Sequence, residues 1–409
     1  MKSWVEVSEQ RLAANYRLLM EAAGAGTAVL AVVKANAYGH GAAICAPVLA
    51  RAGAKWLGVT DVAEGAAVRE ALTSEGISSA MQPEILVMSG LIGDEAGAVV
   101  RHGLTPVVWD RQQVEWLAGA VSRAGSGVPL AVHVEIDTGM ARQGVRPGED
   151  LDELLGWLRA QSGLRLGGVM THFASSEIAG SPQTVEQAGL FEEAVGAVKA
   201  AGLQPAWVHA GNSSTVDNQG VKNFGEGSPA WLRRLAASVG ARSMVRTGLA
   251  LYGYCLPIEQ ASVSSTKEDV VRPGVEPRLQ HVMTWKTRVI GLRDVRPGDT
   301  VGYNAIFSAQ RAMRLALLPV GYADGVRREL SGSDTRPGGW VMVHGRCAPV
   351  VGRVSMNLTI VDVTEILDVA VGDEAVVLGE GITANDHARI AGTIAYEIVC
   401  GVRASSRLV

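Results

Sequence analysis

The sequence predicts an α/β protein in which a (β/α)8 barrel is followed by a mainly antiparallel β-domain. The chain has 409 residues, which is more than one ordinary hydrophobic core needs. Short apolar runs alternate with segments of helical period as far as about residue 253. Beyond about residue 280 the pattern changes to short β-rich runs separated by turn residues. The expected domains are residues 1–256 and 257–409, with the first few residues able to pair with the second domain.

The first domain is predicted from eight apolar runs that have the composition of strands buried on both faces. Between them, stretches such as residues 112–123 and 149–159 place apolar side chains three and four positions apart, as amphipathic helices do. Repeated strand-then-helix units are the pattern of a (β/α)8 barrel. The runs are residues 28–33, 56–60, 85–88, 106–109, 130–136, 168–171, 207–210 and 244–246.

The second domain begins after a stretch rich in Pro, Ser and charged residues, 257–280. Turn sequences such as Pro-Gly-Asp and Asp-Gly then separate short runs of β-formers, which predicts an antiparallel or barrel-like domain. One helix is expected near the end, at residues 385–400. The predicted strands are residues 282–292, 313–320, 340–343, 347–354, 358–363 and 375–378.

Composition excludes several classes of function. The formal net charge is -4 and the basic residues are scattered, so no nucleic-acid partner is expected. Charged residues interrupt the first twenty residues, and no apolar stretch is long enough to span a bilayer, so we expect a cytoplasmic protein without a membrane partner. Cys45, Cys255, Cys347 and Cys400 lack the spacing of a metal site or a disulfide framework, and we expect small buried side chains and no metal.

Lys34 stands at the end of the first apolar run, where a primary amine has little hydration to keep it protonated. Such a lysine can act as an amine nucleophile. The structural alternative is an ammonium group that ends a strand and reaches into solvent. Asn36, Tyr38 and His40 follow in a glycine-flanked turn, which favours a site built on a strand-to-helix loop.

Other chemically useful side chains also follow predicted strands. Barrel active sites lie at the carboxyl ends of the strands, so these residues are expected to gather at one edge. Glycine at the eighth strand-to-helix turn lets backbone N–H groups approach a phosphate, which predicts a cradle from Ser213, Gly248 and Leu249. Taken singly, each motif is also compatible with ordinary turn or core chemistry. The strand-end residues are Glu135 and Arg142, His172, Asn212 and Ser213, and Arg246, Gly248 and Leu249.

The string from Ala28 to Gly41 resembles the pyridoxal-phosphate lysine motif of alanine racemases. The resemblance implies that Lys34 holds pyridoxal 5'-phosphate covalently and that Tyr38 contacts its phosphate. Similar motifs follow in the family's order as far as Tyr396, so the resemblance covers nearly the whole chain.

The resemblance also assigns the cofactor's other neighbours. Arg142 would lie near the phenolic oxygen and the substrate carboxylate, and His172 near the pyridine ring. Asn212 and Ser213 would stand at the phosphate, with Tyr396 a further phosphate partner. Arg246 would face the pyridine nitrogen, and because guanidinium only donates, that nitrogen must accept and stay unprotonated. An unprotonated ring is a weaker electron sink, which favours clean proton exchange at Cα over transamination.

Three motifs in the second domain match the family's substrate side. A racemase needs a proton acceptor on each face of its planar intermediate, and Tyr303 matches the family's second base beside Lys34. Its pKa would have to fall below the usual 10, and His172 and Arg246 are the neighbours expected to lower it. Met356 is expected to offer its backbone N–H to the substrate carboxylate. Tyr322 and Arg353 belong to strings that resemble the substrate entrance.

Some positions depart from the family's pattern. Glu135 replaces a lysine that is carbamylated in many members, and our hypothesis is that its carboxylate gives Arg142 a charge-assisted partner. Asn357 replaces the usual aspartate, which bears on substrate range. Residues 219–237 look like an inserted loop or helix, and residues 257–280 also look extended.

The resemblance implies a homodimeric racemase that interconverts L- and D-alanine for peptidoglycan, with Tyr303 and Met356 supplied by the partner subunit. The alternative within this class is a racemase of broader or different specificity, such as serine. A decarboxylase on the same barrel would need acid and cysteine motifs that the second domain lacks. A non-catalytic cofactor carrier would be a barrel alone, without Tyr303.

Overall fold

The computed structural model describes residues 2–125, 127–218, 227–260 and 273–409. It divides into two compact units. The barrel unit comprises Leu12–Ala35 and Cys45–Gln280, and the β-unit comprises Met1–Arg11, Asn36–Ile44 and His281–Val409.

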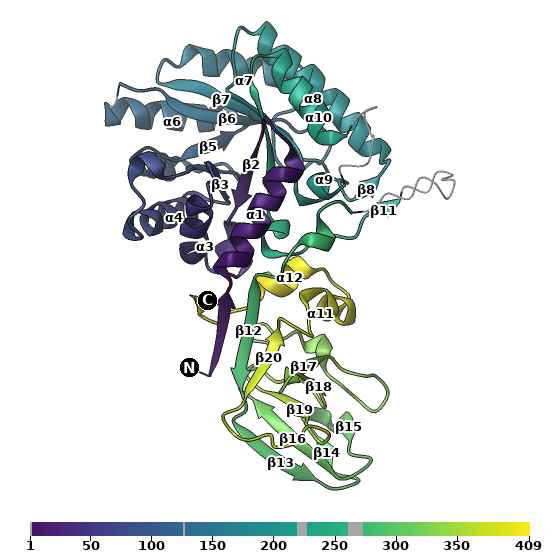
Figure 1. The fold of residues 1–409 in the computed structure, drawn as a ribbon. Helices are drawn as coiled ribbons and strands as arrows, with labels where there is room; N and C mark the ends of the chain where they lie inside the picture. The colour runs from purple at the N-terminus through teal and green to yellow at the C-terminus, as the bar shows by residue number, and fades with distance from the viewer. Residues whose placement is uncertain (1, 126, 219–226, 261–272) are drawn as a thin grey trace. The chain divides into compact units, whose positions relative to one another are not determined.

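Eight parallel strands close into the barrel of the first unit (Figure 1). Strand β10 pairs with β2 on one side and with β9 on the other, which completes the ring. Each predicted run overlaps one of these strands, so the predicted (β/α)8 barrel is confirmed. In barrel order the strands are β10 (Arg242–Thr247), β2 (Thr27–Val32), β3 (Trp56–Val59), β4 (Glu84–Val87), β5 (Thr105–Val108), β6 (Leu130–Glu135), β7 (Leu164–Met170) and β9 (Trp207–His209).

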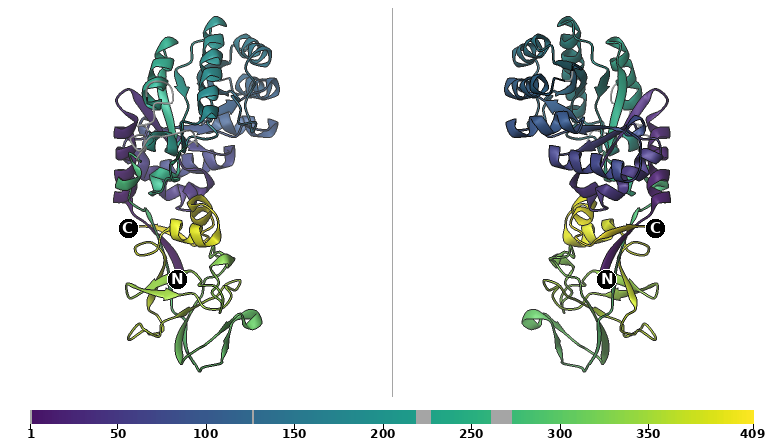
Figure 2. Two further views of the ribbon diagram at one scale, coloured as in Figure 1. Left: turned by 90° about the vertical axis from the view of Figure 1, so that its right-hand side faces the viewer. Right: turned by 90° about the vertical axis from the view of Figure 1, so that its left-hand side faces the viewer.

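Helices cover the outside of these strands, as Figure 2 shows for the barrel unit. Local sequence sets their ends: Asp110 caps the first turn of α6 by accepting the N–H of Gln113, and Gly125 ends this helix in the left-handed conformation. The helices are α1 (Glu9–Ala23), α2 (Lys34–Tyr38), α3 (Ala42–Arg51), α4 (Val62–Ser74), α5 (Ala96–Arg101), α6 (Arg111–Ala124), α7 (Glu149–Ala160), α8 (Pro182–Ala200), α9 (Ser213–Asp217) and α10 (Ser228–Ser238).

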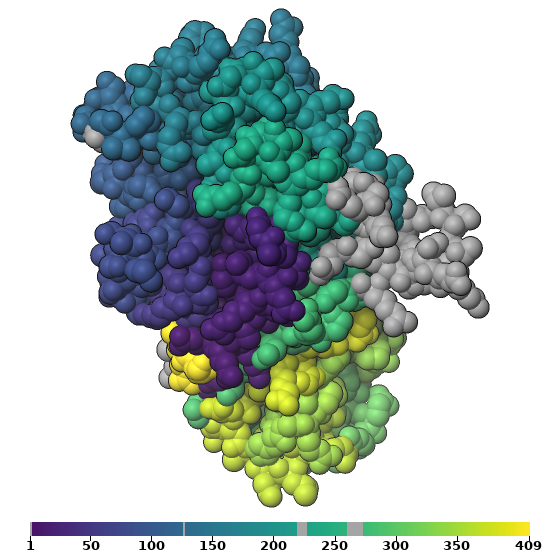
Figure 3. All heavy atoms as spheres, turned by 45° about the horizontal axis from the view of Figure 1, so that its top comes forward, coloured from purple at the N-terminus to yellow at the C-terminus, as the bar shows by residue number. Residues whose placement is uncertain are grey.

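Helix α1 is joined by hydrogen bonds to α10 and to the chain after β10. The Arg233 guanidinium donates to the carbonyl oxygen of Ala23 at 3.0 Å, and Asn15 donates to that of Leu251 at 3.0 Å. In the space-filling view the purple α1 lies against the green residues that precede the β-unit (Figure 3).

The barrel interior is filled by aromatic and imidazole rings. Trp56 lies 5.4 Å from His133 and 5.9 Å from Trp207 between ring centroids. His133 lies 4.9 Å from His209. A Cβ on Gly168 would come within 2.7 Å of the His133 ring, so glycine on β7 provides the space for this imidazole.

The β-unit is built mainly from antiparallel sheets, as predicted. The largest has the order β18-β17-β20-β12-β1-β21, in which only the β1–β21 pair is parallel. A second sheet has the order β13-β16-β19. The strands are β1 (Ser3–Val7), β12 (Met283–Arg288), β13 (Gly291–Val295), β14 (Thr300–Val301), β15 (Phe307–Ser308), β16 (Met313–Leu318), β17 (Trp340–Val343), β18 (Arg346–Pro349), β19 (Thr359–Asp362), β20 (Glu374–Leu378) and β21 (Ser406–Leu408).

One predicted strand and one predicted helix of the β-unit each form two separate elements in the structure. The run 282–292 forms β12 and β13, because Val289 bonds to Asp373 while Ile290 bonds to Leu317 and the chain passes from one sheet to the other. The helix predicted at 385–400 forms α11 (Ala384–Ala391) and α12 (Ala395–Cys400), because Gly392 takes a left-handed conformation that ends α11.

The two extended stretches are described in part. Residues 219–226 and 261–272 lie outside the described residues. The remainder of the first stretch contains the start of α10 at Ser228. In the second stretch, β11 (Glu259–Gln260) pairs with β8 (Ile178–Ala179).

The expectation of four buried cysteines is wrong for two of them. Cys45 and Cys255 are buried, whereas Cys347 and Cys400 are exposed. Cys347 lies on β18, which is the edge strand of its sheet, and Cys400 is the last residue of α12. Among the described residues, no helix combines the length and apolar character that a bilayer span requires.

Candidate active site

Lys34 directly follows the buried strand β2 and begins the short element α2. The four residues after it, Ala35 to Tyr38, all have positive φ values between 50° and 54°. Non-glycine residues pay about 1–2 kcal/mol each for the left-handed conformation. A run of four such residues beside the predicted nucleophile is therefore a strained turn held by its surroundings.

The end of this left-handed turn makes its hydrogen bonds and packing contacts within the β-unit. Asn36 accepts the N–H of Gly41 with its carbonyl oxygen at 2.8 Å and the N–H of Ala42 with its side chain at 2.9 Å. A Cβ on Gly39 would clash with the carbonyl oxygen of Val399, so only glycine fits there. The rings of Tyr38 and Tyr396, both predicted phosphate partners, lie 5.9 Å apart in this unit. Burial raises the pKa of the Tyr38 phenol, so this side chain is protonated at neutral pH.

Arg246, at the end of β10, is a buried cation of the barrel unit. Its Nη2 donates to the carbonyl oxygen of Thr171 at 2.7 Å and to Nδ1 of His172 at 3.1 Å. Its Nη1 donates to Nδ1 of His209 at 3.3 Å. Burial lowers the pKa of Arg246 to about 10, against the opposing effect of Glu135, and the group stays charged at neutral pH. A guanidinium has five N–H groups, so donor capacity remains beyond these three bonds.

Arg246 sets the protonation of the neighbouring histidines. Because guanidinium only donates, His172 and His209 must accept at Nδ1 and carry their protons on Nε2. Nε2 of His209 lies 2.8 Å from Nδ1 of His133, so the same arrangement extends to the third ring. Burial and the Arg246 charge lower the pKa of His172 and of His133 to about 3, and that of His209 well below 6.5.

A group of donors for an anion surrounds Ser213. Its hydroxyl oxygen accepts the N–H of Gly248 at 3.0 Å and that of Ala250 at 3.3 Å. The adjacent Thr247 hydroxyl is buried and has no hydrogen-bond partner among the described residues. The buried Leu249 lies between the two N–H groups. Hydroxyl and amide donors that meet between neighbouring strand ends are the chemistry that holds a phosphate.

Asn212 orients this donor group. Its side chain caps the short helix α9 by accepting the N–H of Thr215 at 3.2 Å, while the Thr215 hydroxyl accepts the N–H of Asn212 at 3.1 Å. This reciprocal cap fixes the first turn, in which Ser213 lies.

The hypothesised ion pair between Glu135 and Arg142 is not formed. The Glu135 carboxylate instead accepts a hydrogen bond from Gln143, whose amide also donates to the carbonyl oxygen of Met88 at 2.8 Å. Glu135 is buried whereas Arg142 is exposed. Arg142 acts on Glu135 only through space: burial raises the pKa of Glu135, and Gln143, Arg246 and Arg142 oppose the rise.

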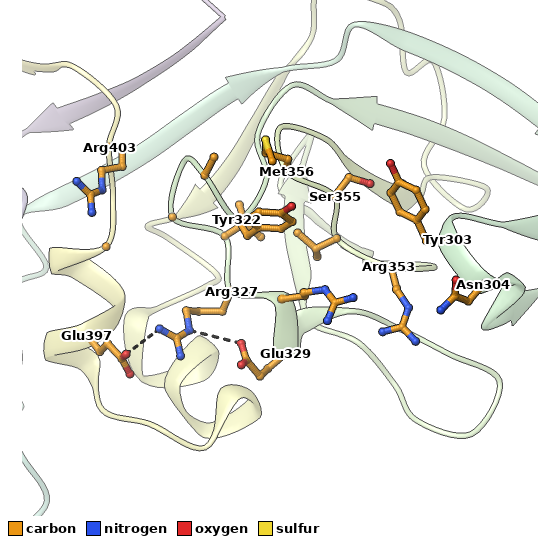
Figure 4. A pocket seen from close by; sticks show the side chains of 16 residues that line it. Tyr303, Asn304, Tyr322, Arg327, Glu329, Arg353, Ser355, Met356, Glu397 and Arg403 are labelled. Atoms are coloured by element: carbon orange, nitrogen blue, oxygen red, sulfur yellow. Dashed lines mark hydrogen bonds and ion pairs between the residues drawn. The ribbon is translucent and has the colours of Figure 1, made fainter.

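Tyr303, Tyr322, Arg353 and Met356 meet in the β-unit. They line one pocket of about 1300 Å³ (Figure 4). Tyr303 is 67% exposed and Met356 56%, which is unusual for such large apolar surfaces. Tyr303 stands on a turn whose next residues, Asn304 and Ala305, have positive φ values.

Polar pairs shape the rest of this pocket. Arg327 contacts Glu397 at 2.8 Å and Glu329 at 3.5 Å, as the dashed lines in Figure 4 show. Outside the residues that line the pocket, Asn357 follows Met356 and donates to the Asp324 carboxylate at 3.4 Å. An aspartate at position 357 would place its own carboxylate beside that of Asp324. The asparagine therefore avoids a repulsion between two negative charges.

Several residues of the site escaped prediction from the sequence. His209 accepts a hydrogen bond from Arg246, and His133 in turn bonds to His209. Gln143 donates to Glu135, and Glu64 accepts the backbone N–H beside Lys34. The alternation of side chains along a strand could have indicated them, because it places His133 and Glu135 on one face of β6. A buried histidine on a barrel strand also needs a polar partner.

Two family models match the chain. The family model described as alanine racemase, N-terminal domain, matches residues 7–256, and that described as alanine racemase, C-terminal domain, matches residues 282–409. A protein named alanine racemase from Symbiobacterium thermophilum is 36% identical over 408 residues, covering 98% of this chain and 94% of the relative.

Solved structures show the same fold. Alanine racemase from Streptomyces coelicolor A3(2) has a TM-score of 0.83 at 31% identity and covers 100% of this chain and 98% of its own. A structure from Bartonella henselae, described as alanine racemase with covalently bound pyridoxal phosphate, has a TM-score of 0.76 at 24% identity, covering 100% of both chains.

Proposed function

The chain belongs to the alanine racemase family, and from that premise we propose which of its residues interconvert L- and D-alanine. The observation that carries the assignment is the arrangement of the barrel unit: a strand-end lysine, a buried arginine bonded to neutral histidines, and an anion cradle. Members of the family use pyridoxal 5'-phosphate, and this chain does so too.

The residues of the barrel unit fit this cofactor. Lys34 supplies the amine for the covalent link. The Ser213 hydroxyl, whose oxygen accepts the N–H groups of Gly248 and Ala250, would donate its own O–H to the phosphate. The Thr247 hydroxyl, which has no partner in the part of the chain that the structure describes, is a further available donor next to Gly248. When bound, the cofactor draws electrons from the substrate Cα and so acidifies its hydrogen. Tyr38, Asn212, Leu249 and Tyr396 complete the proposed set around the phosphate.

Two bases on opposite faces move the proton. The Lys34 amine would take or return a proton at Cα on one face, and the phenol oxygen of Tyr303 would do so on the other. A single base would return the proton to the face from which it came, so inversion needs both residues.

Arg246 would set the hydrogen bonding at the pyridine nitrogen of the cofactor. Its remaining N–H groups would donate a hydrogen bond to the pyridine nitrogen without giving up a proton. His172 is neutral because burial and Arg246 lower its pKa to about 3. An uncharged imidazole beside the cofactor would have no proton to give up at neutral pH.

The substrate carboxylate is held by Arg142 and by the backbone N–H of Met356, with Tyr322 and Arg353 around the entrance. Guanidinium suits a carboxylate because it offers two parallel N–H donors. Glu135 then acts at a distance, as a buried carboxylate held by Gln143 that attenuates the local positive charge.

We further propose a homodimer with shared active sites, in which each barrel receives Tyr303 and Met356 of the partner chain. The exposed aromatic and sulfur surfaces of the β-unit pocket support this assignment, because they are the kind of surface that a subunit contact covers. The product serves peptidoglycan synthesis.

Racemisation itself tests the proposal. Purified protein supplied with pyridoxal 5'-phosphate should abolish the optical rotation of L-alanine and, separately, that of D-alanine, with serine as the comparison substrate. Retention of rotation in both alanine samples would contradict the assignment, and faster loss with serine would redirect it to the broader-specificity racemase.

A further inference from the structure

We propose that Glu64 is a positioning residue for Lys34, and that it acts by bridging two backbone N–H groups across neighbouring strand ends. This inference rests on the proposed function, because it concerns how the covalent lysine is aimed.

The bridge uses both oxygens of one carboxylate. Oε1 accepts the N–H of Ala35 at 2.7 Å, and Oε2 accepts the N–H of Thr60 at 2.8 Å. Ala35 follows Lys34 directly, and Thr60 is the first residue after β3. Charged acceptors make stronger hydrogen bonds than neutral ones, and both distances are short.

These bonds fix the chain on each side of Lys34. The N–H of Val33, the residue before it, donates to the carbonyl oxygen of Gly58 at 2.8 Å. Lys34 is therefore flanked by one amide tied to β3 and one tied to Glu64, so the position and direction of its Cα–Cβ bond are set by β3 and by the start of α4.

Glu64 is itself oriented by the first turn of α4. Asp61 caps this helix by accepting the N–H of Glu64 at 2.8 Å. The Glu64 side chain then reaches back past the cap to Thr60. The partial positive charge at a helix N-terminus favours an anion, which keeps the carboxylate in place.

The bridge matters because Ala35 begins the strained turn. Ala35 has a φ of 50°, and the next three residues are also left-handed. Without an acceptor for the Ala35 N–H, the first residue of the turn can relax toward ordinary φ values and carry Lys34 with it. Displacing a reacting group by about 1 Å can slow catalysis by about 100-fold.

Glu64→Gln is the direct variant, because glutamine keeps the length but offers one acceptor and an NH₂ group that opposes an N–H donor. Glu64→Asp is the second variant, since its carboxylate keeps the charge but is too short to reach both amides. Glu70→Gln is the matched control: it lies on the same helix and is exposed.

Two measurements test the inference. In cofactor-free protein, hydrogen exchange of a peptide spanning residues 33–41 should accelerate in both Glu64 variants and stay unchanged in the control. In loaded protein, single-turnover loss of deuterium from Cα should slow about 10- to 100-fold for the enantiomer that Lys34 deprotonates, and much less for the other. The ratio of these two rates does not depend on how much protein is active.

Unchanged exchange with an unchanged rate ratio would overturn the inference. Equal slowing for both enantiomers would overturn it as well, because it would indicate general destabilisation. Wild-type protein that racemises neither enantiomer would contradict the proposed function, whereas the exchange result tests the bridge independently of activity.

Discussion

Nη2 of Arg246 donates to Nδ1 of His172 at 3.1 Å, and this bond makes His172 a neutral acceptor with its proton on Nε2. The same guanidinium imposes the same tautomer on His209. Arg246 therefore stays charged while its neutral neighbours accept its hydrogen bonds. Its charge also lowers the pKa of His172 and of His209, so both stay uncharged at neutral pH.

His209→Phe should destabilise the protein. The change removes the acceptor for Nη1 of Arg246 and the donor for Nδ1 of His133, both buried. Leaving two buried polar groups unsatisfied should lower the free energy of unfolding by about 2–4 kcal/mol. Urea unfolding of the cofactor-free protein measures this, with His102→Phe at the end of α5 as control. An equal loss in both variants would count against the account.

Stability should fall as the pH drops from about 7 toward 4. Burial lowers the pKa of His133 and of His172 from 6.5 to about 3, so between these values the unfolded chain binds protons that the folded chain does not. Their stabilisation is complete above pH 6.5 and is lost as the pH approaches 3. Glu135, with its raised pKa, has the opposite sign and reduces the slope.

Urea unfolding at several pH values checks this dependence. His209→Phe removes one group with a lowered pKa, so its stability should vary less steeply with pH than that of the wild type. A steeper dependence in the variant would contradict the assignment of neutral, buried histidines.

Glu135→Gln should weaken substrate binding with little loss of fold. Glutamine can still accept the hydrogen bond from Gln143, but the negative charge that acts on Arg142 and Arg246 is gone. We expect KM for alanine to rise severalfold and wild-type activity to be independent of added bicarbonate. Glu149→Gln, in the exposed first turn of α7, is the control. Kinetics identical to wild type would remove Glu135 from the site.

Tyr303→Phe should block proton transfer on one face and leave the cofactor bound. The ring and its packing persist, and only the phenolic oxygen is lost. Loss of Cα deuterium should fall by about 100-fold or more for one enantiomer, while the visible absorbance of the bound cofactor is retained. Full activity for both enantiomers would exclude Tyr303 as a base.

The gathering of the strand-end residues could be predicted from the sequence, because a barrel brings the carboxyl ends of its parallel strands to one edge. The places of Lys34 and Ser213 after barrel strands could therefore be predicted without coordinates. The contact between His133 and His209 could not be predicted in this way, since β6 and β9 are separated by β7 and meet only across the interior. That contact depends on Gly168 leaving room for a ring, a three-dimensional fact that strand periodicity does not contain.

The Glu135 hypothesis failed for a related reason. Charge complementarity suggested Arg142 as the partner, but the loop after β6 returns through Val145, whose N–H bonds to the Glu135 carbonyl oxygen at 2.9 Å. This return brings Gln143 to the carboxylate. The glutamate bridge beside Lys34 was equally hidden, because it joins a side chain of α4 to a backbone group 29 positions earlier.

The central claim is that Lys34 carries the cofactor. The most direct measurement is borohydride reduction of the loaded protein followed by peptide mapping of the stable adduct. The account predicts one labelled peptide, modified at Lys34, in protein that racemises alanine before reduction. A label on any other lysine, or no label in active protein, would contradict it.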